Sequence, residues 1–143
     1  MTTTMFDFND GKGPVRAHRH FNGGGWIADS AIVADSVYLG PNARVYDTAS
    51  VHCNVKLFGN ARVCGNAWVT DSATVYGNAV VFGNAKVFGN AEVHDNAMIF
   101  GDVKVNGIVL PGSVICDDEK PVSTIGTKAI ITDLDINKSV YKT

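Results

Sequence analysis

The residues best suited to chemistry gather near the start of the chain, where basic and imidazole side chains precede a run of glycine. Arg16, His18, Arg19 and His20 are followed by three consecutive glycines at 23–25. Consecutive glycines allow a loop backbone to approach a ligand closely, and exposed amides beside arginine and histidine suit phosphates. The segment therefore predicts an anion or nucleotide contact, although the same residues also fit a purely structural cap.

Two further histidines, His52 and His94, each directly follow a branched apolar residue. A positioned imidazole can act as the general base that removes a proton from a substrate hydroxyl or amine. An ordinary surface histidine is the simpler interpretation of each, and we predict no catalytic residue.

Metal and disulfide chemistry have little support in the sequence. His18 and His20 alternate along a possible strand, but no Glu or Cys at ligand spacing completes a metal site. The chain has an odd number of cysteines, and their spacing does not resemble that of metal ligands: Cys53, Cys64 and Cys116. We expect reduced thiols, no metal and no cofactor.

A six-residue repeat running from Asp29 to Asn106 must position most of these side chains. A typical hexad is Gly59-Asn60-Ala61-Arg62-Val63-Cys64, in which a small apolar slot is followed two positions later by a branched apolar slot. The first slot is always Ala or Val, and the second is always Val, Leu or Ile. A short period that continues over so many residues is typical of a solenoid, whose units bury their apolar faces only by stacking on one another.

Each hexad predicts one short strand and one corner. Two apolar slots separated by one variable residue have the period of a strand with one buried face, and the Gly-Asn or Asp-Ser pair suits a turn. A corner every six residues closes most economically as a triangle, which gives 18 residues per coil and parallel strands about 4.8 Å apart. The predicted fold class is all-β, a triangular parallel β-helix.

The spacing from Val63 to Ala67, repeated from Val81 to Ala85, resembles that of the hexapeptide-repeat proteins. The resemblance covers residues 29–106 and implies a left-handed parallel β-helix, usually assembled as a trimer. The family includes acyltransferases, carbonic anhydrases and proteins with no known reaction. The regular Gly-Asn-Ala-x-Val-aromatic form is similar to small repeat proteins of bacteria and their phages.

A second resemblance lies after the repeats. The segments 111–115 and 121–126 resemble the last coil and exit loop of coenzyme-A-dependent acetyltransferases. This implies an alternative function as an acyltransferase using acetyl-coenzyme A. Residues 29–106 contain no inserted loop to build an acceptor pocket, which favours a non-catalytic protein.

Residues 18 apart should lie above one another on one face of the helix. Arg44 and Arg62 then stack beside Tyr46; they are either two solvated arginines or, since like charges this close repel, a pair that holds a phosphate or carboxylate between them. On the same face, an outward apolar block is formed by Val80, Phe82, Met98 and Phe100. A monomer rarely exposes such a block, so we predict that it is the trimer interface.

The chain divides into three segments. Residues 1–28 should form an N-terminal cap, residues 29–106 the β-helix, and residues 107–143 a terminal coil with a small β extension. The register slips by one residue after residue 106, and strand-like runs lie at 129–132 and 139–141.

Composition excludes several partners. A net charge of −2 and a pI near 6.0 argue against nucleic-acid binding, which needs a concentrated basic excess. No stretch approaches the roughly 20 apolar residues of a membrane span, so we expect no membrane partner and a cytoplasmic protein.

The function expected from the sequence is a non-catalytic, homotrimeric binding protein. Its ligand would be a small anionic metabolite or nucleotide signal, bound or sequestered near subunit boundaries, and a phage origin would suit that role. The ligand-binding candidates are Arg16, His18, Arg19, His20, Arg44, Tyr46 and Arg62. The alternatives are the acyltransferase and a purely structural spacer.

Overall fold

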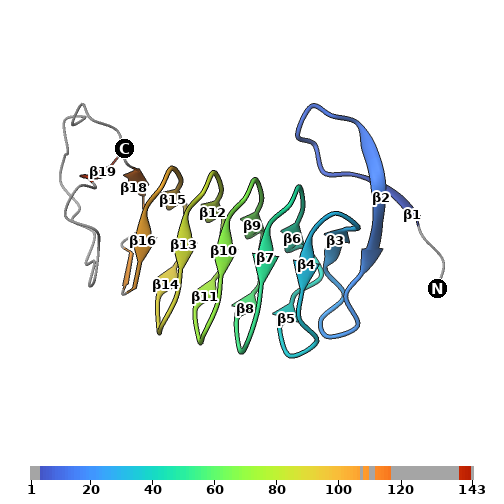
Figure 1. Ribbon diagram of the computed structural model, residues 1–143, viewed down its shortest axis with the longest axis horizontal. Helices are drawn as coiled ribbons and strands as arrows, with labels where there is room; N and C mark the ends of the chain where they lie inside the picture. Colours follow the sequence, from blue (N-terminus) through green and yellow to red (C-terminus); the bar gives the residue numbers. More distant parts are fainter. Residues whose placement is uncertain (1–3, 107, 110–111, 117–138, 143) are drawn as a thin grey trace.

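The protein is a parallel β-solenoid of about five turns, as Figure 1 shows. The computed structural model describes residues 4–106, 108–109, 112–116 and 139–142, and every regular element among them is a strand. Most strands are only two residues long, and each coil contributes one strand to each of three sheets. The predicted all-β solenoid is confirmed.

Sheet 1 has nine strands in the order β1 (Thr4–Asp7), β2 (Pro14–Arg19), β3 (Trp26–Ala28), β6 (Arg44–Val45), β9 (Arg62–Val63), β12 (Val80–Val81), β15 (Met98–Ile99), β18 (Ser113–Cys116) and β19 (Ser139–Lys142). Sheet 2 has five strands, β16 (Lys104–Val105), β13 (Lys86–Val87), β10 (Trp68–Val69), β7 (Ser50–Val51) and β4 (Ile32–Val33). Sheet 3 has five strands, β17 (Ile108–Val109), β14 (Glu92–Val93), β11 (Thr74–Val75), β8 (Lys56–Leu57) and β5 (Tyr38–Leu39).

The two apolar slots of the hexad form the core. These slots form columns of small and branched residues, and Ala61 and Val63 in the middle of the solenoid have exposed fractions of 0%. The variable slot between them points outward, and Trp68 pairs with Ser50 on one side and Lys86 on the other. The sequence therefore determines both which residues are inside and which outward residues stack in columns.

The corners require a backbone conformation that few residues adopt. Gly77 has φ of +68°, and a Cβ added there would lie 2.7 Å from the backbone nitrogen of Asp95 in the next coil. Where the corner residue is aspartate, as at Asp47 and Asp71, the carboxylate accepts the backbone N–H of the corner above, at 3.0 and 2.9 Å. Gly and Asp therefore both suit these corners, because Gly provides space and Asp provides a hydrogen bond.

The two ends of sheet 1 are antiparallel, unlike its middle. At the N-terminal end β1 pairs with β2 and β2 with β3, and at the C-terminal end β18 pairs with β19. The predicted strand at 139–141 is confirmed by β19, whereas the one at 129–132 lies outside the described residues. The predicted one-residue slip is wrong, because Glu92 pairs with Ile108, two positions earlier than in the other coils.

Candidate ligand-binding face

The outer face of sheet 1 carries three of the predicted arginines. Arg19 pairs with Trp26, Trp26 with Arg44, and Arg44 with Arg62. Side chains of directly paired residues lie on the same side of a sheet. The structure therefore brings Arg19, Arg44 and Arg62 to one face, with Trp26 between the first two.

An aromatic stack separates Arg19 from Arg44. The ring of Phe6 stacks on that of Trp26, with centroids 4.3 Å apart and planes at 19°. The guanidinium of Arg19 lies 4.6 Å from the Trp26 centroid, and that of Arg44 lies 5.1 Å from the Phe6 centroid. Such cation–π contacts contribute about 0.5–1 kcal/mol at accessible sites and fix where each guanidinium sits.

Arg44 and Arg62 occupy neighbouring coils and are both partly buried. Among the described residues, no ion pair joins either guanidinium to a carboxylate. Two positive charges at one strand spacing repel each other, and the repulsion grows as the surroundings become less polar. The pair is therefore a place where a phosphate or carboxylate would be favourable.

Tyr46 lies beside the arginine pair, but its ring is covered by the protein itself. Its exposed fraction is 6%, and the Phe8 ring stacks on it at 4.8 Å and 21°. Burial, followed by the hydrogen bond with Cys64, raises the pKa of Tyr46 to about 12. Tyr46 is a neutral phenol at physiological pH, and Phe8 covers one face of the ring of this predicted ligand-binding residue.

Cys64 lies next to Tyr46 on this face and forms a hydrogen bond with it. Burial raises the pKa of its thiol above the ordinary value, and the nearby carboxylate of Asp47 contributes in the same direction. Since the thiolate is the reactive form of cysteine, a raised pKa lowers the reactivity of the Cys64 thiol.

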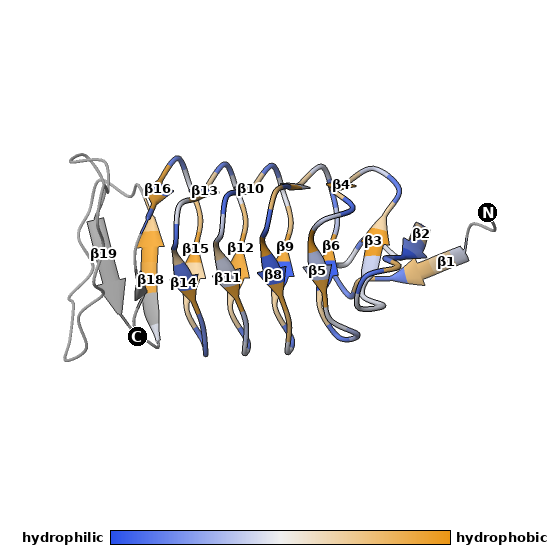
Figure 2. Ribbon diagram, turned by 90° about the horizontal axis from the view of Figure 1, so that it is seen from below, coloured by the Kyte–Doolittle hydropathy of each residue, from blue (hydrophilic) through white to orange (hydrophobic). Residues whose placement is uncertain are grey.

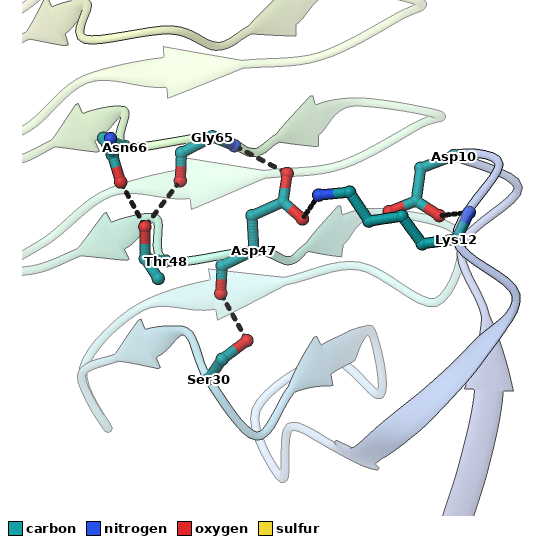
Figure 3. Close-up of polar contacts among 7 residues, drawn as sticks. All are labelled: Asp10, Lys12, Ser30, Asp47, Thr48, Gly65 and Asn66. Carbon is teal, nitrogen blue, oxygen red and sulfur yellow. Dashed lines mark hydrogen bonds and ion pairs between the residues drawn. The ribbon is translucent and has the colours of Figure 1, made fainter.

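A polar strap fastens the β1–β2 hairpin onto this face, as Figure 3 shows. Lys12 Nζ donates to Asp47 Oδ1 at 3.0 Å, and the backbone N–H of Lys12 donates to Asp10 Oδ1 at 3.0 Å. The Lys12 ammonium is exposed, and its hydrogen bond to Asp47 raises its pKa. The same Asp47 carboxylate accepts the Gly65 N–H, so the strap joins the hairpin to two successive coils.

The other predicted ligand residues of the N-terminal segment lie on the opposite side of β2. Arg16 pairs with Met5 and is exposed, whereas His18 pairs with Ile27 and contacts Asp29 Oδ1 through Nδ1 at 2.8 Å. His20 directly follows β2 and is buried. Its Nε2 lies 2.8 Å from the Val37 carbonyl oxygen, and since a carbonyl oxygen can only accept, Nε2 is the donor. The structure does not bring these three side chains to Arg44 and Arg62.

His52 and His94 lie apart from each other, after β7 of sheet 2 and β14 of sheet 3. The His52 ring meets Trp68 edge to face at 6.1 Å. The His94 ring stacks on Tyr76 at 5.1 Å, and its Nδ1 lies 3.4 Å from Asp95 Oδ2. Each histidine contacts one aromatic ring of a neighbouring coil, and the structure does not bring the two imidazoles together.

The apolar block continues the arginine face toward the C-terminal end. Val80 pairs with Arg62 on one side and Met98 on the other, and Phe82 stacks on Phe100 at 4.8 Å and 12°. Met98 is 37% exposed. Figure 2 shows the hydrophobic colour running along sheet 1 from β12 to β18. In a single chain, one face is thus cationic near one end and apolar near the other.

Sequence reasoning missed Phe6, Trp26 and Lys12 as parts of this face. Trp26 lies one coil before Arg44, so extending the repeat by one coil would have placed it. No periodic signal could have placed Phe6 or Lys12, because the hairpin that carries them is outside the repeat.

Within the described residues, no cluster of histidine, cysteine and acidic side chains has the geometry to hold a metal ion. No helix in the same part of the chain is long and apolar enough to cross a lipid bilayer.

Comparison of the chain with protein-family models, with curated proteins and with solved structures finds no match. The assignment of function therefore depends on the geometry of the face itself.

Proposed function

We propose that this protein is a non-catalytic binding protein that holds a small anionic metabolite or nucleotide on the outer face of sheet 1. The observation that supports this best is the pair of arginines, Arg44 and Arg62, stacked in neighbouring coils without a carboxylate partner among the described residues. Arg19 extends the positive charge along the same face.

The charge arrangement suits a phosphate. Two unit charges about 5 Å apart repel by roughly 3 kcal/mol at an effective dielectric constant near 20. An anion between them adds two attractive contacts that outweigh this repulsion, and each guanidinium can offer a parallel pair of N–H donors. The aromatic stack holds Arg44 in place before a ligand arrives, which lowers the entropic cost of binding.

We further propose that the working form is a homotrimer of left-handed β-helices with ligands at the subunit boundaries. The apolar block lies directly beyond Arg62 on the same face, so a neighbouring subunit covering Val80 and Phe82 would end close to the arginine pair. Covering apolar surface contributes about 25 cal/mol per Å². A small rigid trimer of this kind would act by sequestering its ligand.

Calorimetry with a panel of nucleotides and phosphorylated metabolites tests the binding role. We expect one member to bind, more weakly as salt concentration rises, because salt screens accessible charges. Arg62→Ala should lower the affinity about tenfold or more, given the roughly 1.5–3 kcal/mol of a charged hydrogen bond. Lys56→Ala is the matched control, because Lys56 fills the same slot of its hexad on sheet 3. An affinity equal in Arg62→Ala and wild type would refute this site.

Light scattering tests the proposed assembly. The double variant Phe82→Asp with Phe100→Asp should lose the trimer mass, because the stacked rings would become two adjacent charges. Phe58→Asp is the control, since Phe58 belongs to a comparable ring stack on sheet 3 and is 37% exposed. Retention of the trimer mass by the double variant would remove the apolar block from the interface.

A further inference from the structure

A pocket on sheet 2 lies away from the arginine face. It has a volume of about 260 Å³ and is lined by Trp68, Thr70, Asp71, Lys86 and Phe88, which come from β10, β13 and the corners after them. The proposed function makes no use of any of these residues, so the pocket needs its own explanation.

The walls of the pocket are aromatic. Trp68 is 45% exposed, although an indole is among the costliest side chains to leave in water, and Phe88 lines the same pocket from the next coil. Aromatic side chains favour stacked or edge-to-face contact with another ring. The volume is below the roughly 300–1,000 Å³ of drug-sized sites, so it suits one planar ring rather than a larger molecule.

The pocket is lined by one cationic and one anionic side chain, Lys86 and Asp71. Lys86 Nζ lies 5.4 Å from the Trp68 ring centroid, and Lys86 pairs with Lys104 in the next coil. Within the described ranges, no carboxylate forms an ion pair with either lysine. Asp71 already uses Oδ2 to accept the Gly89 N–H at 2.9 Å, which ties that carboxylate to the corner. A negatively charged group on a ligand would therefore meet an ammonium that has no ion-pair partner among the described residues and that the Trp68 ring holds at the pocket.

We propose that this pocket binds a planar aromatic ring bearing a carboxylate or a phosphate. The ring packs against Trp68 and Phe88, and its anionic group meets the ammonium of Lys86. The inference is independent of the proposed function, because Lys86 and Trp68 lie on sheet 2 and the arginine pair lies on sheet 1.

Nuclear magnetic resonance of the two indole N–H groups provides the test, with Trp26→Phe identifying the signal of Trp68. Benzoate and phenyl phosphate are titrated separately, which distinguishes a carboxylate from a phosphate preference, and benzylamine provides the same ring with a positive charge. We expect at least one anion to shift the Trp68 signal saturably and benzylamine to bind at least about tenfold more weakly.

Two lysine variants and one arginine variant separate the possible outcomes. Lys86→Met keeps the apolar stem and should weaken anion binding about tenfold, whereas Lys56→Met on sheet 3 should leave it unchanged. Arg62→Ala should also leave it unchanged, so a failure here is distinct from a failure of the arginine site. Equal binding of benzylamine, unchanged affinity in Lys86→Met, or no shift of the Trp68 signal by either anion would overturn the proposal.

Discussion

Replacing Phe8 with alanine should release the β1–β2 hairpin from the solenoid. Phe8 is 1% exposed, and its ring lies 4.8 Å from both Phe6 and Tyr46. Phe→Ala in a core costs about 3–5 kcal/mol, and loss of the ring pairs is included in that figure. The hairpin lies at one end of the sheet and can relax, so we expect the lower end, about 3 kcal/mol.

This loss should be local, because each part of a solenoid contacts only its neighbours. Amide hydrogen exchange within β2 should therefore accelerate about 100-fold, since every 1.4 kcal/mol is a factor of ten. The pKa of Tyr46, raised to about 12 mainly by burial, should fall toward the ordinary value near 10 in an ultraviolet titration.

The control is Phe21→Ala, because Phe21 lies in the same N-terminal segment and is 77% exposed. It should change neither the exchange rates nor the tyrosine titration. If Phe8→Ala behaved like this control, the packing of the hairpin on Tyr46 would be refuted.

Three further predictions concern the solenoid and its pH dependence. Gly77→Ala should lower the free energy of unfolding in urea more than Gly11→Ala does. Both glycines have positive φ, +68° and +86°, but of the two only Gly77 would bring an added Cβ against the backbone of another coil. Ala79→Leu should lower the free energy of unfolding by about 1–3 kcal/mol, because Ala79 is 0% exposed and leaves no room for a larger side chain. Lys56→Leu should not lower it, because Lys56 points outward, and equal effects of the two variants would contradict the orientation of the slots. Tyr46 has a raised pKa, so between pH about 10 and about 12 the unfolded chain has lost a proton that the folded chain still retains. The free energy of unfolding should therefore be independent of Tyr46 below pH about 10 and should fall by about 2–3 kcal/mol as the pH rises to about 12. Tyr46→Phe should remove that fall, and an identical alkaline profile in the variant would assign it to another group.

The repeat could be predicted because its signal is redundant. Each coil repeats the same small and branched slots, so the columns of Ala61 and Val63 and the stacking of Arg44 on Arg62 follow from spacing alone. The last coil could not be placed correctly, because the repeat pattern ends at residue 106 and no repeated slot fixes the partner of Glu92, which is Ile108.

The candidate site could be predicted only in part for a related reason. Arg44, Arg62 and the apolar block belong to the repeat, whereas Phe6, Phe8 and Lys12 reach the same face through a hairpin. The sequence gives no register between that hairpin and the first coils, so the covering of Tyr46 by Phe8 was not foreseen. Alternation along β2 places His18 and Arg19 on opposite sides, so grouping them in one site from their closeness in sequence ignored a signal that the strand period contains.

Native mass spectrometry of the purified protein tests the central claim most directly, because it reports the number of chains and any bound small molecule together. We predict a mass of three chains, with an anionic adduct that is retained by Lys56→Ala and lost in Arg62→Ala. A monomer mass, or a trimer that gains no adduct when a full panel of nucleotides and phosphorylated metabolites is supplied, would contradict the account.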